Sequence, residues 1–530
     1  MTGDTLPGET HRVELYDTTL RDGAQRAGLA YTIEDRLRIL HLLDELGFPF
    51  VEGGWPGANP RDTEFFQVAA REPLRHATLT AFGMTRRAGE RAEDSPALRD
   101  LLESETEVAC LVGKSWDLHV RAALRTTTDQ AVAMVGESIA FLVARDRRVF
   151  FDAEHFFDGH AADRGFALAV LRAAEDAGAE RLVLCDTNGG TLPGAIEAAV
   201  RDVRGQTAVP LGIHVHDDAG CAVASSLAAV GAGVLQVQGT VNGYGERCGN
   251  ADLVVVAANL ALKLGVECLP PGSIGRLAEL SHYVAEVANV PPDGHQPFVG
   301  RHAFTHKAGL HTSAVARLAA AYEHIPPEVV GNRRGVAVSD LGGRSTVELK
   351  AREFGLELAP ATTSRLVSTL KEMEAAGYAF EAADASLELL MRRLDGWCQP
   401  FFEVEAFRAH VDGRRSERPL AEATVKVRVA GRRHIATAEG RGPVSALDNA
   451  LRQALGRDYP ELDDVTLTDY RVRVLDGKEG TAATVRVLID SSDGEKEWTT
   501  AGVSEDVIEA SWQALTDSLL FGLLHPRTTR

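Results

Sequence analysis

The first half of the chain alternates short apolar segments with longer segments in which apolar residues recur at helical spacing. Eight apolar or β-branched runs have the length of buried strands. They lie at residues 13–16, 50–52, 78–82, 108–112, 149–152, 182–185, 212–215 and 234–238. The segments between them are long enough for the helices that connect parallel strands. The pattern therefore predicts a repeated strand–helix unit.

The segment after the first strand shows why the connections should be helical. Thr32 is followed by Asp35, which resembles a capping box with Asp in place of the usual Glu. Leucines then recur every three residues, at Leu37, Leu40, Leu43 and Leu46. Gly47 is the residue type that commonly follows a helix. We therefore expect a helix that begins after Thr32 and ends before Gly47.

Eight such units in about 280 residues match the α/β class, and in particular a (β/α)8 TIM barrel. We assign this barrel to residues 1–290. The alternative is an open, doubly wound sheet. The predicted strands are not followed by a G-x-G-x-x-G phosphate loop, which disfavours that alternative.

Polar residues follow the predicted strands at the end where barrel enzymes keep their chemistry. Asp22 follows the first strand, His214 and His216 end the seventh, and Asn250 follows the eighth. In a closed barrel strand one neighbours strand eight, which neighbours strand seven, so these side chains should converge. Residues i and i+2 of a strand point the same way, so both imidazoles can face one ion. The set predicts a divalent-metal site.

The chain changes character after the barrel. Pro291-Pro292 and Pro326-Pro327 interrupt a less regular region at 291–400, which we interpret as a helical linker with helices at 366–376 and 387–394. Residues 401–530 form an α+β domain with an internal duplication. Its repeated parts are a strand at 423–429 followed by a helix at 445–455, and a strand at 483–489 followed by a helix at 505–520. Without obvious catalytic residues, this domain is expected to sense a ligand or to dimerise.

Length and composition describe a globular protein with more than one core. The chain has 530 residues, of which 45% are hydrophobic and 25% charged. Its net charge of −20 argues against general binding to nucleic acid or to anionic membranes. The six cysteines show no C-x-x-C spacing, so neither a zinc cluster nor a disulfide framework is indicated. No apolar run reaches the roughly 20 residues of a membrane span, and the N-terminus does not resemble a secretory signal, so we expect a cytoplasmic location.

Four motifs of the chain occur in the order found in the isopropylmalate, homocitrate and citramalate synthases. They are DTTLRDG at 17–23, His214-x-His216, GYGERCGN at 243–250 and FTHKAGLH at 304–311. The chain therefore resembles this family of metal-dependent TIM-barrel acyltransferases over nearly its whole length. The segments EGGWPGANP at 52–60 and CDTNGGTLP at 185–193 most resemble the citramalate synthase branch.

The resemblance implies that acetyl-CoA is condensed with pyruvate and that the thioester is hydrolysed to citramalate and CoA, a step towards isoleucine. It also implies a metal site made by Asp22, His214 and His216, with Asn250 as a further, weaker ligand. Such oxygen and nitrogen ligands suit Mg²⁺, Mn²⁺ or Zn²⁺, and the sequence does not choose among them. Isopropylmalate or homocitrate synthesis from a larger 2-oxo acid is one alternative, and a metal-dependent aldolase or lyase is another.

Five residues are candidates for catalysis and substrate binding. Arg21 is permanently charged and can donate two hydrogen bonds to oxygens, which suits it to binding substrate and holding negative charge. By resemblance, Glu154 and His311 belong to the acid/base machinery, Tyr322 comes from the partner subunit, and Thr187 binds the carboxylate of the keto acid. Which group takes the proton is left open. Arg21 could instead neutralise Asp17 and Asp22, and Glu154 could pair with a neighbouring base.

Two further expectations follow from the resemblance. The C-terminal domain should be a regulatory domain of a homodimer that binds the end-product amino acid. That amino acid would be isoleucine, or leucine if the product is isopropylmalate. One departure from the family is Asp217 in place of the usual Asn, followed by Asp218. We expect this extra carboxylate to raise cation affinity or to hydrogen-bond an imidazole.

Overall fold

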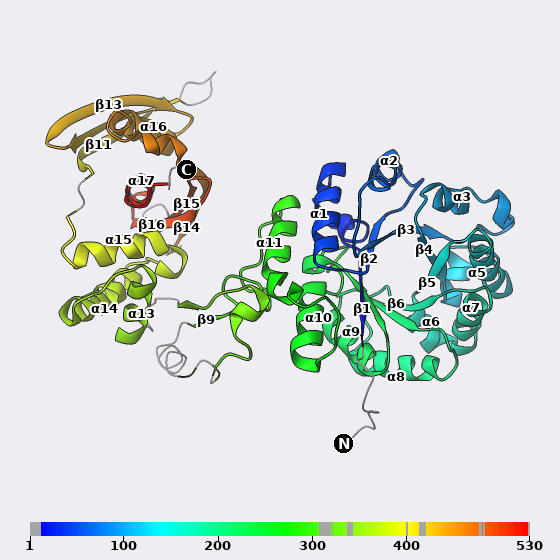
Figure 1. Ribbon diagram of the computed structural model, residues 1–530. Coiled ribbons are helices and arrows are strands. Elements are labelled where there is room, and N and C mark those ends of the chain that lie inside the picture. The colour runs from blue at the N-terminus through cyan, green and yellow to red at the C-terminus, as the bar shows by residue number, and fades with distance from the viewer. Residues whose placement is uncertain are drawn as a thin grey trace. The chain divides into compact units, whose positions relative to one another are not determined.

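The computed structural model describes residues 12–306, 318, 320, 322–336, 343–398, 401–412, 420–475, 480 and 483–527. The chain divides into two compact units (Figure 1). The first unit comprises Met1–Phe304 and Pro327–Arg333, and the second comprises Thr305–Pro326 and Arg334–Arg530.

The first unit is a closed barrel of eight parallel strands in the order β1 to β8. The strands are β1 Glu14–Asp17, β2 Phe50–Gly54, β3 Thr78–Met84, β4 Val108–Lys114, β5 Arg148–Glu154, β6 Arg181–Asp186, β7 Leu211–Val215 and β8 Gln236–Gly239. All eight strands that the apolar runs predict are present. The TIM barrel is confirmed, and the open doubly wound sheet is wrong, because β1 pairs with β8 and closes the sheet.

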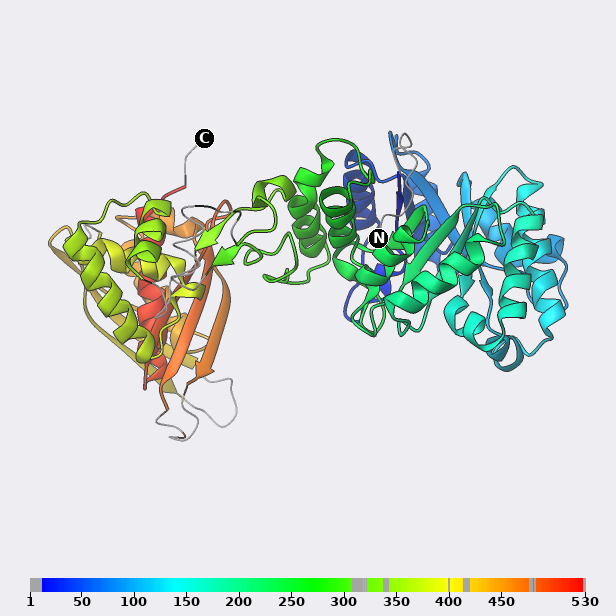
Figure 2. The ribbon, with the colours of Figure 1, turned by 90° about the horizontal axis from the view of Figure 1, so that it is seen from below.

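Helices cover the outside of this barrel (Figures 1 and 2). They are α1 Ile33–Glu45, α2 Pro60–Ala69, α3 Pro96–Glu103, α4 Asp117–Ala122, α5 Thr128–Val143, α6 Phe156–Ala162, α7 Arg164–Asp176, α8 Pro193–Arg204, α9 Ala222–Gly231, α10 Leu253–Asn259 and α11 Leu277–Val287. The predicted first helix is confirmed with its capping box, because the hydroxyl of Thr32 accepts a hydrogen bond from the backbone N–H of Asp35. The Asp35 carboxylate in turn accepts the backbone N–H of Thr32.

Aromatic side chains fill part of the barrel interior. The ring centroids of Tyr16 and Phe50 lie 6.0 Å apart, and those of Phe50 and Phe150 lie 5.0 Å apart. The hydroxyl of Tyr16 is buried among them and donates to the Glu52 carboxylate at 2.8 Å. Buried hydroxyls need such a partner, since an unpaired polar group in the interior is costly. The aromatic layer therefore contains a hydroxyl that binds the buried Glu52 carboxylate.

The second unit contains two similar antiparallel sheets, each with its own helix. One sheet has the order β11-β12-β13 and packs on α16, and the other has the order β14-β15-β16 and packs on α17 (Figure 1). The duplication is therefore confirmed. The elements are β11 Glu403–Asp412, β12 Leu420–Val429, β13 Arg432–Gly440, α16 Pro443–Leu455, β14 Thr466–Val474, β15 Val485–Ser492, β16 Glu497–Ser504 and α17 Val507–Leu524.

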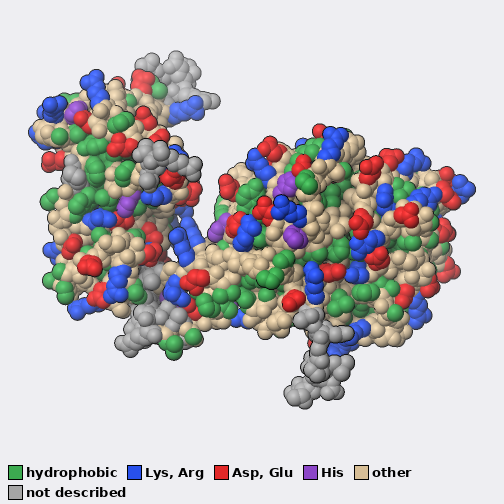
Figure 3. Space-filling model, viewed as in Figure 1, with side chains coloured by type: hydrophobic (Ala, Val, Ile, Leu, Met, Phe, Trp, Pro, Cys, Tyr) green, Lys and Arg blue, Asp and Glu red, His purple; other side chains and the backbone are tan. Residues whose placement is uncertain are grey.

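The rest of this unit is largely helical where it is described. Its elements are β9 Thr305–His306, β10 Gly335–Val336, α13 Arg344–Glu353, α14 Pro360–Ala375 and α15 Asp384–Leu394. The two predicted helices of the linker region are present as α14 and α15. Among the described helices of the whole chain, none is long and apolar enough to cross a membrane. Charges of both signs are mixed over the visible surface of both units (Figure 3).

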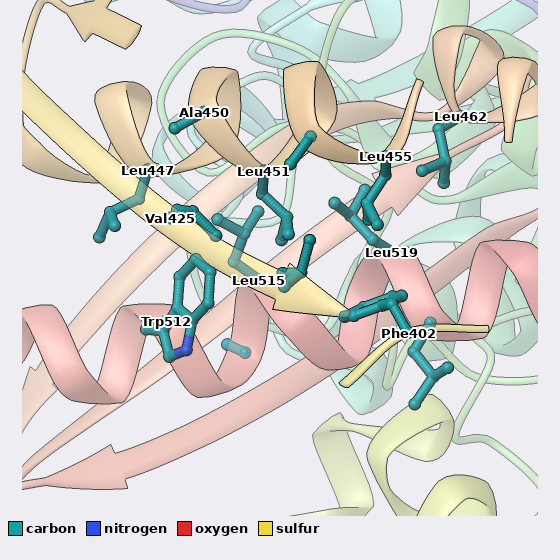
Figure 4. Packing of buried hydrophobic residues seen from close by; sticks show 14 of the residues in the cluster. Phe402, Val425, Leu447, Ala450, Leu451, Leu455, Leu462, Trp512, Leu515 and Leu519 are labelled. Atoms are coloured by element: carbon teal, nitrogen blue, oxygen red, sulfur yellow. The ribbon is translucent and has the colours of Figure 1, made fainter. Parts of the chain in front are cut away.

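One apolar core joins the two halves of the duplication. Side chains of α16, α17 and β12 point toward one another in this core (Figure 4). Leu451 on α16 and Val425 on β12 are fully buried, and Leu515 on α17 is nearly so. Each half therefore covers the apolar surface of the other, as expected for elements that cannot bury it alone.

The substitution Leu451→Ala should lower the free energy of unfolding by about 2–5 kcal/mol, because it removes buried apolar contacts and leaves a cavity. Urea denaturation followed by circular dichroism measures this change. Val507→Ala, at a position on α17 that is 40% exposed, is the control and should cost less than about 0.5 kcal/mol. Equal losses in the two variants would contradict this description of the core.

Candidate active site

A cavity of about 320 Å³ opens at the C-terminal ends of the barrel strands. Six of the residues selected from the sequence line it: Arg21, Asp22, Glu154, Thr187, His214 and His216. They follow or end strands β1, β5, β6 and β7, so barrel closure brings together residues that are far apart in the sequence. In a TIM barrel this is the face on which active sites are built.

Asp22, His214 and His216 form a tight, buried cluster. Asp22 Oδ2 lies 3.2 Å from His214 Nε2, which lies 3.3 Å from His216 Nε2. One ligand atom of each residue can be chosen so that all three atoms lie within 4.8 Å of one another. Asp22 Oδ2 and His216 Nδ1 are buried without a hydrogen bond. A carboxylate and two imidazoles that converge with unused lone pairs fit a divalent metal ion.

Asn250 lies beside this cluster. Its backbone forms a bridge with His216, and its side-chain amide donates to the carbonyl of Tyr244 at 3.0 Å. The other side-chain atom, Oδ1, is buried and has no hydrogen-bond partner. Gly245 is required next to it, because a Cβ at that position would lie 2.2 Å from Asn250 Nδ2. The glycine-rich turn therefore leaves the space that the Asn250 side chain occupies.

The charges of the cluster are matched. Burial alone would raise the pKa of Asp22, but Arg21 and then His214 outweigh it and hold this pKa well below its usual range. Burial alone would lower the pKa of His214, and Asp22 outweighs it and raises this pKa. Asp22 is thus the stable anion of the site, which is the state a metal ligand requires.

Arg21 is held between two carboxylates and an aromatic ring. Its Nε donates to Glu52, its Nη1 lies 3.4 Å from Asp22, and its guanidinium carbon lies 3.9 Å from the Phe82 ring centroid. The sequence offered Asp17 and Asp22 as counter-ions, and for Asp17 this is wrong. The Asp17 carboxylate instead accepts two hydrogen bonds from Thr19. Burial raises the pKa of Asp17 to about 7.

Glu154 forms an ion pair with Lys114, and both side chains face the cavity. Glu154 therefore does pair with a neighbouring base. That base is Lys114, which was not predicted from the sequence. Strands β4 and β5 pair these two residues directly in register. The sequence feature that could have identified Lys114 is its position as a lysine at the end of an apolar strand.

Thr187 contacts the backbone just after Glu154. The next residue, His155, has a left-handed backbone with φ of 57°, and its N–H donates to the Thr187 hydroxyl oxygen at 2.9 Å. Because this oxygen accepts one bond, its own proton stays available to a ligand in the cavity. Two further polar residues that the sequence reasoning missed, Asp152 and Gln238, lie deeper in the barrel and are hydrogen-bonded to each other.

One of the two expectations for Asp217, that its carboxylate hydrogen-bonds an imidazole, is wrong. Asp217 Oδ1 accepts the backbone N–H of Ala222 at 2.8 Å, just before α9. Asp218 makes a bidentate pair with Arg247 at 2.7 and 2.9 Å. These carboxylates are engaged by the loops around the site, so they fix loop structure and do not bind an imidazole.

The remaining two candidates belong to the second unit. Tyr322 is 48% exposed there. His311 lies outside the described residues. The nearby His306 has its Nε2 3.4 Å from Glu323, a carboxylate that also binds Arg334.

Family models match most of the chain. The HMGL-like model matches residues 12–282, which cover the barrel. The model described as homocitrate synthase post-HMGL domain-like matches residues 298–377. The LeuA allosteric (dimerisation) domain matches residues 381–521, which include the duplicated sheets.

Curated relatives match the chain from end to end. An (R)-citramalate synthase of Streptomyces coelicolor is 53% identical over 96% of both chains. An (R)-citramalate synthase of Synechocystis sp. is 50% identical over 96% of both chains. One of Geobacter sulfurreducens is 48% identical over 96% of this chain and 97% of its own. The chain therefore belongs to the (R)-citramalate synthase family.

Proposed function

We propose that the chain condenses acetyl-CoA with pyruvate and hydrolyses the resulting thioester, giving (R)-citramalate and CoA. The observation that carries this proposal is the full-length match to several (R)-citramalate synthases at about half identity. A proton leaves the methyl group of acetyl-CoA, the carbanion attacks the keto carbon of pyruvate, and water then cleaves the thioester. The isopropylmalate, homocitrate and lyase alternatives are less well supported, because the relatives at about half identity are (R)-citramalate synthases.

Asp22, His214 and His216 would hold the divalent ion, with Asn250 Oδ1 as a weaker fourth ligand. Their burial and their unused lone pairs support this assignment. When bound, the ion supplies a Lewis acid that polarises the keto group of the second substrate. The mixed set of oxygen and nitrogen donors suits Mg²⁺, Mn²⁺ or Zn²⁺.

Arg21 would bind substrate and stabilise the negative charge that develops on a carbonyl oxygen. Its contacts with Glu52 and Asp22 fix the guanidinium at the wall of the cavity. Both carboxylates also keep it charged, because they outweigh the effect of burial and raise its pKa. A preorganised charge of this kind needs no reorganisation during the reaction, which is the main source of electrostatic catalysis.

Thr187 would donate its free hydroxyl proton to the carboxylate of the keto acid. Glu154, Tyr322 and His311 would supply the acid/base groups, Tyr322 from the partner subunit, and the proton acceptor among them is left open. The ion pair with Lys114 holds the Glu154 carboxylate at the wall of the cavity, within reach of a bound substrate.

The C-terminal part would form a homodimer and bind the end-product amino acid, isoleucine, as an inhibitor. The match to an allosteric (dimerisation) domain supports both roles. The edge strand β14 also exposes three apolar side chains, Leu467, Val472 and Val474. Exposed apolar edges of this kind are surfaces on which chains pair. We keep the assignment of 1–290 to the catalytic barrel, 291–400 to the linker that contributes to the site, and 401–530 to regulation, in a cytoplasmic enzyme.

Release of the CoA thiol should be fastest with pyruvate when pyruvate, 2-oxoisovalerate and 2-oxoglutarate are compared in the presence of acetyl-CoA. A thiol reagent measures the rate, and chromatography identifies the product as citramalate. A preference for 2-oxoisovalerate would point to isopropylmalate synthesis and would overturn the choice of substrate.

Removal of the metal should abolish turnover. A chelator should stop thiol release, and an added divalent ion should restore it, because the keto group is then polarised again. His214→Ala should lower kcat by at least about 100-fold, since a ligand is lost together with its charge contact. The surface variant His282→Ala is the control, and near-normal turnover of His214→Ala would show that the ion is held elsewhere.

The metal-free protein should lose stability as the pH falls from about 6.5 to about 4, because His216 resists protonation in the folded state. Burial and then His214 lower the pKa of His216 to about 4. In this window the unfolded chain binds a proton that the folded protein does not, so protonation favours unfolding. Denaturation at several pH values with chelator, compared with His216→Asn, isolates this contribution. Parallel curves for the two proteins would refute it.

A further inference from the structure

A series of hydrogen-bonded, buried polar side chains lies inside the barrel, next to the cluster of Asp22, His214 and His216. Strands β7 and β8 pair His214 with Gln238 in register, and His214 Nδ1 lies 3.0 Å from Gln238 Oε1. Gln238 Nε2 donates to Asp152 Oδ1 at 3.1 Å. All three side chains are buried, with Gln238 fully inaccessible. The series thus runs from β5 through β8 to β7.

The hydrogen-bond directions in this series are determined by chemistry. A side-chain amide has one donor end and one acceptor end, and a carboxylate only accepts. Asp152 therefore attracts the amide nitrogen of Gln238, which turns the amide oxygen toward His214. An oxygen accepts, so Gln238 favours the neutral imidazole that carries its hydrogen on Nδ1, against the Asp22 carboxylate, which lies 3.2 Å from Nε2 and attracts the hydrogen there. The lone pair then resides on Nε2, the atom that faces Asp22 and His216.

The opposite amide orientation would have the reverse effect. It would direct the Gln238 amide hydrogens at Nδ1, which would then have to accept. The imidazole hydrogen would move to Nε2 and occupy the position that an ion needs. Metal-binding histidines commonly have their second nitrogen fixed in this way by a neighbouring acceptor.

We infer that Gln238, oriented by Asp152, is a positioning residue that selects the metal-binding tautomer of His214. This inference rests on the proposed metal site. It assigns a role in metal binding to Gln238 and Asp152, which would not contact the ion. Burial alone does not explain the arrangement. Gln236 is equally inaccessible on the same strand, two residues earlier, yet its side-chain oxygen has no partner.

The test measures Mn²⁺ affinity by calorimetry on the full-length protein. Gln238→Met keeps the approximate volume and removes both hydrogen bonds. We expect its Mn²⁺ dissociation constant to rise about 10- to 100-fold, the usual effect of losing such a partner. Gln236→Met is the matched control, with the same exchange at an equally buried position, and its affinity should stay within about twofold of the parent value.

Two further measurements keep the test decisive if Gln238→Met fails to fold. Asp152→Asn is nearly isosteric and removes the group that orients the amide, so its Mn²⁺ affinity should also fall. In the metal-free protein at alkaline pH, ¹⁵N spectra should show a larger share of His214 with its hydrogen on Nδ1 in the parent than in Asp152→Asn, because Asp22 attracts the hydrogen to Nε2 in both. An equal share of the Nδ1–H form in the two proteins would overturn the inference.

The outcomes separate the inference from the function beneath it. If the parent protein does not bind Mn²⁺, or His214→Ala binds it equally well, the metal site itself is wrong. If the parent binds Mn²⁺ through His214 but Gln238→Met and Asp152→Asn bind it as tightly, the site stands and the positioning role is refuted.

Discussion

Closure of the sheet between β1 and β8 is the constraint on which the rest of this structure depends. In an open sheet the first strand would lie at an edge or in a different order, and Asp22 would be remote from His214 and His216. The backbone pairing of Asp17 with Gly239 closes the ring instead. Because β7 also pairs with β8, residues separated by about 190 positions in the chain share one small volume.

The barrel interior beneath that volume contains buried charged residues, among them Asp17, Glu52 and Asp152. Burial raises the pKa of Glu52, and Arg21 only partly offsets this effect. The hydroxyl of Tyr16 and the guanidinium of Arg21 together occupy both oxygens of the Glu52 carboxylate. Charges in such a place persist only when each is paired and hydrogen-bonded. The aromatic packing around Tyr16 therefore fixes the position of Arg21 through Glu52.

The sequence predicted the parts of this protein that repeat or that cluster in motifs. The strands and α1 follow from periodicity and capping, and Asp22, His214 and His216 follow from their places at strand ends. Lys114, Asp152 and Gln238 were missed, because no motif or spacing in the sequence distinguishes them from other polar residues on the strands. Their partners come from other strands through register, which one sequence does not reveal. Asp217 was misjudged for a related reason, since its carboxylate binds the backbone N–H of Ala222 at the start of α9, while Asp218 pairs with Arg247 of a neighbouring loop.

The left-handed backbone at His155 has a consequence for Glu154. The strand geometry ends at His155, so Glu154 is the last residue of β5, and its backbone is ordered by pairing with Lys114 of β4. Groups on loops must give up conformational freedom each time a ligand binds, whereas a group on a strand has already lost it during folding. The entropic cost of ordering the backbone that carries the Glu154 carboxylate is therefore incurred once, when the protein folds, and not again in every catalytic cycle.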